Sequence, residues 1–371
     1  MKALSRRRFL AAAALTALAG CTSGSDTAEQ ATPTPTSTPT EATETPTPTA
    51  AVPMADRRLP LPMAPDQLRN EARSGGPPKD GIPSIDEPKF VAADAVDYLD
   101  PGDPVFGVTR DGVAKAYPQK ILVWHEIVND DLAGTPVSVT YCPLTGTAQG
   151  FERGNTTFGV SGRLINNNLV MYDRATETWW PQILATSIPG PWNETPEAGS
   201  LREFRLIWTT WGQWREQNPD TRVLSTDTGH AKNYNRDPYG SYNPRGGYYA
   251  DGNTLFPILH ADDRYDKKTV FMGARTPEGA VAFLKDALRE ADLMSGTIAD
   301  TPVLAIYDDR FDTAYVYRNP EEKTFEFDGG SVVAADGTNR PPDGVSLSRI
   351  HTFDAMWFAW SGYYPDTAVY E

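Results

Sequence analysis

The chain has 371 residues, with 49 acidic against 34 basic residues and a formal net charge of −15. This negative charge argues against nucleic acids and anionic membrane surfaces as partners, because both attract positively charged proteins. Two cysteines, Cys21 and Cys142, are too few for the disulfide framework of a small secreted domain. The folded part must therefore rely on a hydrophobic core, for which the chain is long enough.

The first twenty residues have the features of an export signal. Residues 5–10 place three arginines before an apolar run at 9–19, which is too short to span a bilayer. The arginines and the following Phe-Leu resemble a twin-arginine signal, and residues 18–21 resemble a lipobox. We therefore expect a signal peptide at 1–20 and a lipid on Cys21. The alternative is an uncleaved apolar N-terminus with a chance cysteine.

A stalk is predicted at residues 21–55, which are mainly Thr, Pro, Ala, Glu and Ser and have little to bury. Such a segment stays extended and is expected to hold a globular domain, residues 56–371, clear of the cell surface. The acidic, lysine-poor composition is typical of salt-loving archaea, so we expect a haloarchaeal-type lipoprotein. Its location would be the extracellular face of the cell membrane, with the lipid anchor as its membrane contact.

Alternating apolar residues and turn residues predict the elements of the folded part in chain order. A hairpin is expected at 105–117, where Asp111-Gly112 is typical of a two-residue turn. The other predicted elements are a helix at 118–126, strands at 137–142 and 147–152, a helix at 208–217, a helix at 277–291, strands at 303–308 and 313–318, and a helix at 352–361.

The sequence also contains an internal repeat, in which residues 135–141 (TPVSVTY) match residues 301–307 (TPVLAIY). Tryptophans spaced three residues apart recur in both copies and are expected in the core: Trp211 and Trp214, then Trp357 and Trp360. We predict a strand-rich α+β fold of two pseudo-equivalent halves, about 94–225 and 260–371, packed as one globular unit. Two copies are too few for a solenoid.

Three segments of the first half, residues 124–130, 141–147 and 161–182, are polar where packing gives no reason for it. With residues 256–264 and the closing 357–360, they resemble the DUF3179 family of exported proteins of unknown function. The resemblance covers roughly residues 94–370, and its Tyr-Cys-Pro-Leu block is specific. It implies no activity, because the family has no established one.

The resemblance also has one departure that bears on chemistry. Many relatives have a second cysteine where this chain has Thr145. A Cys-x-x-Cys pair is the usual redox-active arrangement, so the change to threonine weakens a redox interpretation for this chain.

Cys142 ends a predicted strand and precedes a Pro and a Gly turn, which suits a reactive or metal-binding thiol. With His125 as a base it is a candidate catalytic nucleophile. With His125, His260 and His351 it is a candidate metal site, for which copper or zinc would suit the thiolate and imidazole ligands. The alternative is a small buried hydrophobic residue, which is the commonest role of a free cysteine.

The longest polar segment contains the predicted ligand-binding residues. An arginine there would grip an anion bidentately, and two following tryptophans, Trp179 and Trp180, would wall a cleft. The predicted ligand-binding residues are Arg163, Asn166, Asn168, Asp173, Arg174 and Gln182. The alternative is a long hairpin whose Asn and Asp residues satisfy turns.

No phosphate-binding loop, nucleophile elbow or zinc-protease helix is present in the sequence. The leading hypothesis is therefore a surface-anchored module that binds a metal or a small ligand at a Cys/His-centred site in the first half. An extracellular enzyme with Cys142 as nucleophile is the second hypothesis. A structural or interaction protein without an active site is the third.

Overall fold

A computed structural model describes residues 52–371, so the predicted signal peptide, Cys21 and most of the predicted stalk lie outside the described residues. The described residues belong to one compact unit. They form many short strands and five short α-helices, which confirms the prediction of a strand-rich α+β fold. None of these helices has the length and apolar character needed to cross a membrane.

The ordered fold starts before residue 56. Val52 is buried, and Met54 forms a β-bridge with Leu201. The backbone N–H of Ala55 donates to the carbonyl oxygen of Ser200 at 2.7 Å. Residues 52–55, which composition alone assigned to the stalk, therefore pair with the segment around residue 200.

The predicted hairpin at 105–117 is present and belongs to a five-stranded sheet. Arg110 pairs with Val113, and Asp111 and Gly112 between them have φ angles of 48° and 78°, as a type I′ turn requires. The strands of this sheet, in spatial order, are β12 (Ile207–Thr210), β3 (Pro104–Arg110), β4 (Val113–Pro118), β13 (Arg222–Leu224) and β2 (Phe90–Ala92).

Two further sheets surround the segment that carries Cys142. One consists of β11 (Glu203–Phe204), β7 (Thr147–Glu152), β6 (Thr135–Cys142) and β5 (Ile127–Leu132), with α2 (Gln119–His125) leading into β5. The other consists of β1 (Arg73–Ser74), β8 (Phe158–Ile165), β9 (Asn168–Asp173) and β10 (Trp179–Pro181), and it follows α1 (Pro65–Asn70) along the chain. Between β8 and β9, Asn166 and Asn167 have φ angles of 51° and 61° and form a tight turn.

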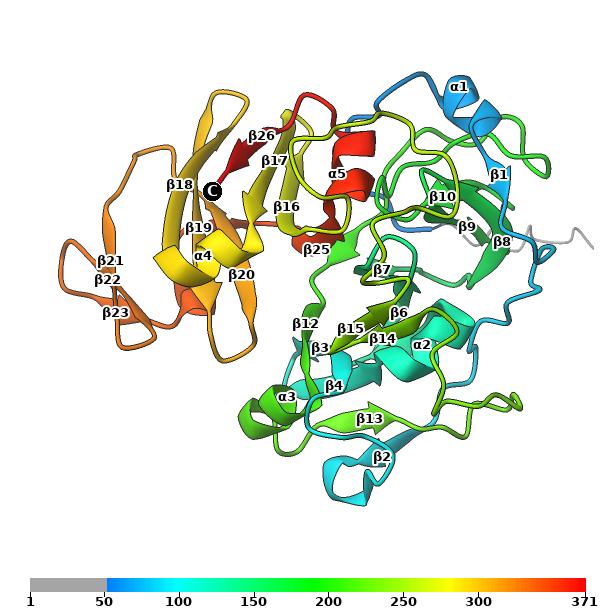
Figure 1. The fold of residues 1–371 in the computed structure, drawn as a ribbon, viewed down its shortest axis with the longest axis horizontal. Helices are drawn as coiled ribbons and strands as arrows, with labels where there is room; N and C mark the ends of the chain where they lie inside the picture. Colours follow the sequence, from blue (N-terminus) through cyan, green and yellow to red (C-terminus); the bar gives the residue numbers. More distant parts are fainter. Residues whose placement is uncertain (1–51) are drawn as a thin grey trace, which may run out of the picture. The chain divides into compact units, whose positions relative to one another are not determined.

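The C-terminal part forms two four-stranded sheets, which lie together in yellow to red in Figure 1. The first contains β25 (Thr352–Met356), β16 (Val270–Thr276), β17 (Gly279–Leu284) and β26 (Ala368–Tyr370). The second contains β18 (Leu293–Ile298), β19 (Thr301–Asp308), β20 (Thr313–Arg318) and β24 (Ser348–Ile350). The C-terminal part also contains the helices α4 (Lys285–Ala291) and α5 (Trp357–Tyr363). The helix α3 (Trp211–Gln217) belongs to the N-terminal part.

Three predicted helices are too long. Residues 279–284 form β17 and only Lys285–Ala291 is helical, because β17 pairs along its whole length with β16. Likewise, residues 352–356 form β25, which pairs with β16, and residues 208–210 belong to β12, which pairs with β3. In each case strand pairing overrides a local preference for helix.

Two tryptophans pack directly on glycines of neighbouring strands, one in each half. A Cβ on Gly107 would lie 2.2 Å from the Trp214 ring, and a Cβ on Gly273 would lie 2.1 Å from the Trp360 ring. The indole N–H of Trp214 donates to Thr221 at 2.9 Å, and that of Trp360 donates to Thr367 at 3.1 Å. The prediction that these tryptophans, with Trp211 and Trp357, lie in the core is confirmed.

The two smallest sheets have two and three strands. They are the hairpin of β14 (Gly240–Tyr242) and β15 (Arg245–Gly247), and the sheet of β21 (Phe325–Asp328), β22 (Ser331–Ala334) and β23 (Asn339–Arg340). The hairpin β14–β15 belongs to the long connection between β13 and β16, and its Tyr242 ring packs on Trp208 while Arg245 bonds to the carbonyl oxygen of Lys268. This connection supplies one wall of the cleft described below.

Candidate functional site

Cys142 ends β6 and is buried, with 1% of its surface exposed. Its Sγ lies 3.5 Å from the carbonyl oxygen of Asn167. Burial raises the pKa of the Cys142 thiol to about 11, and the nearby carboxyl group of Glu126 adds to this effect. A thiol with this pKa is almost entirely protonated at neutral pH, which is the opposite of what a nucleophilic cysteine requires.

Glu126 is a buried acid beside Cys142 that sequence reasoning did not single out. It follows α2 in a left-handed conformation, with a φ of 59°, and its carbonyl oxygen accepts a hydrogen bond from Tyr141 N–H at 2.8 Å. Only 6% of the residue is exposed, and among residues 52–371 its carboxyl group has no hydrogen-bond partner. Burial raises the pKa of Glu126 to about 8, so it is mostly protonated at neutral pH.

Thr145 belongs to a fully buried polar network next to Cys142. Its hydroxyl group lies 2.8 Å from that of Thr147 and accepts from the Asn168 amide at 3.1 Å. Gln182 accepts from Thr147 at 2.7 Å and from Asn168 at 2.9 Å. The network satisfies the polar groups that the strands bury here, which is a structural role for the threonine.

The four predicted metal ligands each have different partners. His125 contacts the carbonyl oxygen of Pro83 at 2.8 Å and the hydroxyl of Tyr234 at 2.7 Å. His260 contacts the carbonyl oxygen of Gly362 at 2.9 Å, and His351 contacts Gln149 at 3.2 Å. Across residues 52–371, no three His, Cys, Asp or Glu side chains are grouped so that they could hold a metal. The geometry therefore does not bring Cys142, His125, His260 and His351 together as a copper or zinc site.

Most predicted ligand-binding residues are engaged within the protein. Asn166 bonds to the backbone of Leu259 and of α5, and Asn168 and Gln182 belong to the Thr145 network. Asp173 accepts from Thr176 and from the indole N–H of Trp180 at 3.0 Å. These side chains are buried and hold the β8–β9 hairpin against its surroundings.

The two arginines that were predicted to grip an anion do not lie together in a binding site. Arg174 bonds to Asp86 at 2.9 Å and to Ser84 at 2.9 Å, and it thereby fixes the segment before β2. Arg163 lies in β8, where it pairs with Ser74 of the edge strand β1, and its side chain is exposed. The tight Asn turn and the internal bonding agree with the alternative of a long hairpin that satisfies its own turns.

A large cleft lies elsewhere in the described part of the chain and was not predicted. It has a volume of about 1090 Å³ and is lined by β12, the β14–β15 hairpin, the loop before β16, α4 and β25. Elements from both parts of the chain therefore form its walls, which is a common location for ligand sites. Three of the ten lysines in the sequence, Lys267, Lys268 and Lys285, line it, a concentration that was visible in the sequence.

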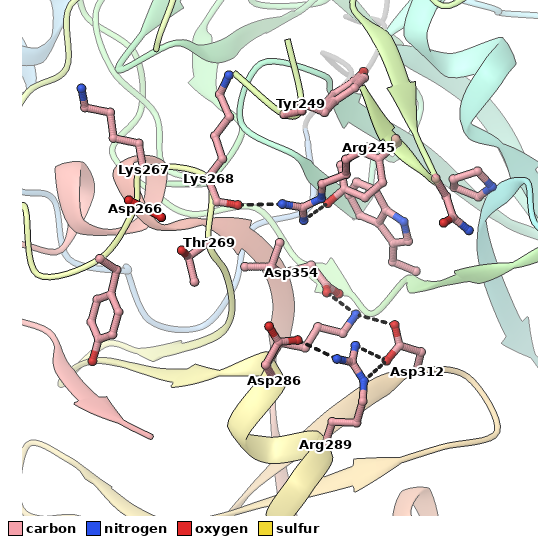
Figure 2. A pocket seen from close by; sticks show the side chains of 18 of the residues that line it. Arg245, Tyr249, Asp266, Lys267, Lys268, Thr269, Asp286, Arg289, Asp312 and Asp354 are labelled. Atoms are coloured by element: carbon pink, nitrogen blue, oxygen red, sulfur yellow. Dashed lines mark hydrogen bonds and ion pairs between the residues drawn. The ribbon is translucent and has the colours of Figure 1, made fainter. Parts of the chain in front are cut away.

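The floor of the cleft is a network of ion pairs (Figure 2). The Lys285 ammonium lies 2.7 Å from Asp354 and 3.5 Å from Asp312. Arg289 pairs with Asp312 at 2.8 Å and with Asp286 at 2.6 Å. Burial acts to lower the pKa of Lys285, but its two aspartate partners outweigh burial and raise that pKa. The floor is therefore charged, internally paired and held in one geometry.

The opposite rim carries cations that are not paired in this way. Arg245 donates to the carbonyl oxygen of Lys268 at 2.9 Å, and its guanidinium lies over the Tyr242 ring at 5.2 Å. The Lys268 ammonium donates to the carbonyl oxygen of Tyr248, and burial lowers its pKa. In the part of the chain that the structure describes, neither Arg245, Lys267 nor Lys268 forms an ion pair. By contrast, Arg264 on the same rim is paired with Asp262 at 2.8 Å.

We predict that Cys142 is inert toward thiol reagents in the native state. A Cys21→Ser variant leaves Cys142 as the single cysteine, and its alkylation by N-ethylmaleimide at pH 8 is measured with and without denaturant. Burial and a pKa of about 11 should make the native rate at least ~100-fold slower than the unfolded rate. Comparable rates in both states would contradict the buried thiol and favour an accessible nucleophile.

We also predict that Glu126 makes the folded state less stable as the pH rises. Its folded pKa of about 8 lies above the ordinary 4.5, so the folded state holds a proton that the unfolded state has lost between these values. The contribution of Glu126 to the free energy of unfolding is therefore largest below about pH 4.5. It decreases as the pH rises to about 8, by a few kcal/mol at most. Glu126→Gln should remove this decrease.

The measurement is the free energy of unfolding in urea from pH 4 to 9 for both proteins. Burial lowers the pKa of His125 and of His351 to about 4, so both histidines lower stability as the pH falls from 6.5. This opposite effect is shared by the wild type and Glu126→Gln, and it cancels in their difference. A difference that does not change with pH would show that Glu126 ionises normally.

The comparisons with curated proteins and with solved structures found no match. The sequence model of one family, described as a protein of unknown function (DUF3179), matches residues 79–367. This match covers most of the chain and includes Cys142, the buried network and the cleft, so the chain belongs to the DUF3179 family.

Proposed function

We propose that this protein is a lipid-anchored, extracellular binding protein whose small polar ligand occupies the charged cleft. The observation that carries this proposal is the cleft itself, with a volume of about 1090 Å³ and walls from both parts of the chain. This volume is slightly above the usual range for small-molecule sites, which is about 300–1,000 Å³. The proposal therefore keeps the expected binding of a small ligand but assigns it to the cleft instead of Cys142.

The ion-paired floor supports binding because it is organised before a ligand arrives. Lys285 and Arg289 are fixed by three aspartates, so little side-chain ordering is left for the binding step. Trp208, Tyr242 and Tyr265 add aromatic surface to the lining. A site with fixed charges and aromatic rings suits a ligand that combines polar groups with a compact carbon skeleton.

An enzyme with Cys142 as nucleophile receives less support. The thiol is buried, its pKa is raised to about 11, and its closest acid, Glu126, is itself mostly protonated. His125, the candidate base, is occupied by Pro83 and Tyr234. A base must lie within hydrogen-bond reach of the nucleophile that it activates.

We also propose that the halves at 94–225 and 260–371 are copies of one ancestral unit. The strand order β12-β3-β4-β13 has the same form as β25-β16-β17-β26, with a parallel final pair in both sheets. The tryptophan-on-glycine contacts at Gly107 and Gly273 recur in the same places. In this proposal Cys142 corresponds to Asp308, and each ends the central strand of its sheet.

The binding proposal predicts that blocking the cleft abolishes ligand-induced stabilisation. Thr269 points into the space between rim and floor (Figure 2), so Thr269→Trp should fill it. Sugars, sugar acids, amino acids and mononucleotides are screened at millimolar concentration for an increase in Tm. A compound present at about 100 times its Kd adds ~2.7 kcal/mol of stability. This increase should vanish in the blocked variant.

Two further variants make this test decisive. Gly252→Trp blocks the other wall, where a Cβ would meet no atom within 4 Å, and should give the same loss. Thr195→Trp is the control, because this exposed residue lies outside the cleft. The proposal fails if no stabilising compound in the panel loses its effect in both blocked variants while keeping it in the control.

The anchoring proposal rests on the lipobox-like sequence before Cys21. Replacing Cys21 by serine removes the thiol that would carry the lipid while leaving the export signal unchanged. In the native host, Cys21→Ser should move the protein from the membrane fraction to the culture medium. Immunoblots of both fractions measure this shift, and Cys142→Ser is the control. Retention of the Cys21→Ser protein in the membrane would reject the anchor.

A further inference from the structure

Arg245 is a cation in the cleft wall without a carboxylate partner among residues 52–371. Its guanidinium uses one N–H on the carbonyl oxygen of Lys268 and approaches the hydroxyl of Tyr242 at 3.5 Å. The other N–H groups have no hydrogen-bond partner within residues 52–371, and Figure 2 shows the guanidinium directed toward the middle of the cleft. An arginine held by its backbone partner and aromatic neighbour presents a fixed fork of donors.

Lys268 is a second cation near Arg245, and it makes a negative group in this part of the cleft more favourable. Lys268 is 94% buried, which is unusual for a lysine that forms no ion pair within the described residues, and its ammonium donates to the carbonyl oxygen of Tyr248 and lies over that ring. The Asp251 carboxylate attracts the charge on Lys268 without forming an ion pair, and Arg245 repels that charge. Two close positive groups, one of them buried, are stabilised when a bound anion lies beside them.

The floor of the cleft cannot provide this anion. Asp354, Asp312 and Asp286 already pair with Lys285 and Arg289. The rim carboxylate of Asp251 acts on Lys268 but forms no ion pair with Arg245 in the described residues, which leaves the ligand as the source of a group that pairs with Arg245. A carboxylate fits this place, because it can accept two parallel hydrogen bonds from a guanidinium.

The remaining polar groups of the cleft indicate what else the ligand contains. Asp251, Asp263 and Asp266 are exposed on the rim and form no ion pair within the described range. Unpaired carboxylates accept hydrogen bonds from hydroxyl groups. Tyr242 and Tyr265 are half-buried and offer ring faces to a compact carbon skeleton.

We propose that the ligand of the cleft is a polyhydroxylated organic acid, whose carboxylate binds Arg245 beside Lys268 and whose hydroxyl groups bind the rim aspartates. This inference rests on the proposed binding function of the cleft and adds the chemical class of the ligand. D-Glucuronate and D-glucose are suitable probes, because they differ only in the replacement of a hydroxymethyl group by a carboxylate.

The experiment is isothermal titration calorimetry of the full folded chain with each probe. Wild type should bind D-glucuronate at least ~10-fold more tightly than D-glucose. Arg245→Gln should weaken D-glucuronate binding by about 10- to 100-fold and leave D-glucose unchanged. Arg245→Lys keeps the charge without the fork and should recover only part of the affinity. Arg58→Gln, an exposed arginine outside the cleft, is the control.

Equal affinities for the two probes, or no effect of Arg245→Gln, would overturn the inference. Inorganic phosphate that competes as well as D-glucuronate would also overturn it, because the site would then accept any small anion. If neither probe binds, the ligand class is wrong, whereas the binding function is judged separately by the blocking variants Thr269→Trp and Gly252→Trp. The two proposals can therefore fail independently.

Discussion

The packing of α5 on the β8–β9 hairpin holds the two parts of the chain together, and the rest of the structure depends on it. The turn at Asn166 bonds to the backbone of α5, and the hydroxyl of Tyr363 donates to the carbonyl oxygen of Ile165 at 2.6 Å. Around these bonds, one apolar cluster combines residues of both parts, such as Trp179 and Trp357. Without this shared core the walls of the cleft would not be held at a constant separation.

Cys142 and the cleft illustrate two different uses of polar residues. Around Cys142, the amides, hydroxyls and Glu126 are inside the protein, and nearly all of the amides and hydroxyls are bonded to one another. Such a network specifies how strands pack but offers nothing to a ligand. In the cleft the pairing is incomplete, since Arg245 lacks an anionic partner in the described chain. Incomplete pairing in an open space is the stronger indication of binding.

Local features could be predicted from the sequence, whereas long-range placement could not. The Asp111-Gly112 turn, the strands before and after Cys142 and the buried tryptophans follow from residue type and alternation. The length of the helix ending at Ala291 was overestimated, because pairing of β17 with β16 is not a local property. The polar residues after Ser161 suggested a site, but their partners lie far along the chain, as the bonds between Asn166 and α5 show. The cleft combines residues from 104 to 354, so periodicity within a segment gives no sign of it.

The separation between a paired floor and an unpaired rim has a consequence for how relatives could diverge. The floor is built on α4 and β25, whose side chains are tied to one another and to the sheet beneath. The rim is built on the β14–β15 hairpin and the loop before β16, where Arg245, Lys267 and Lys268 form no ion pair in the described residues. Substitutions in these loops can change the ligand without disturbing the core, because loops tolerate replacement better than the elements that support them. Proteins with this fold could then bind different ligands while the ion-paired floor of the cleft stays the same.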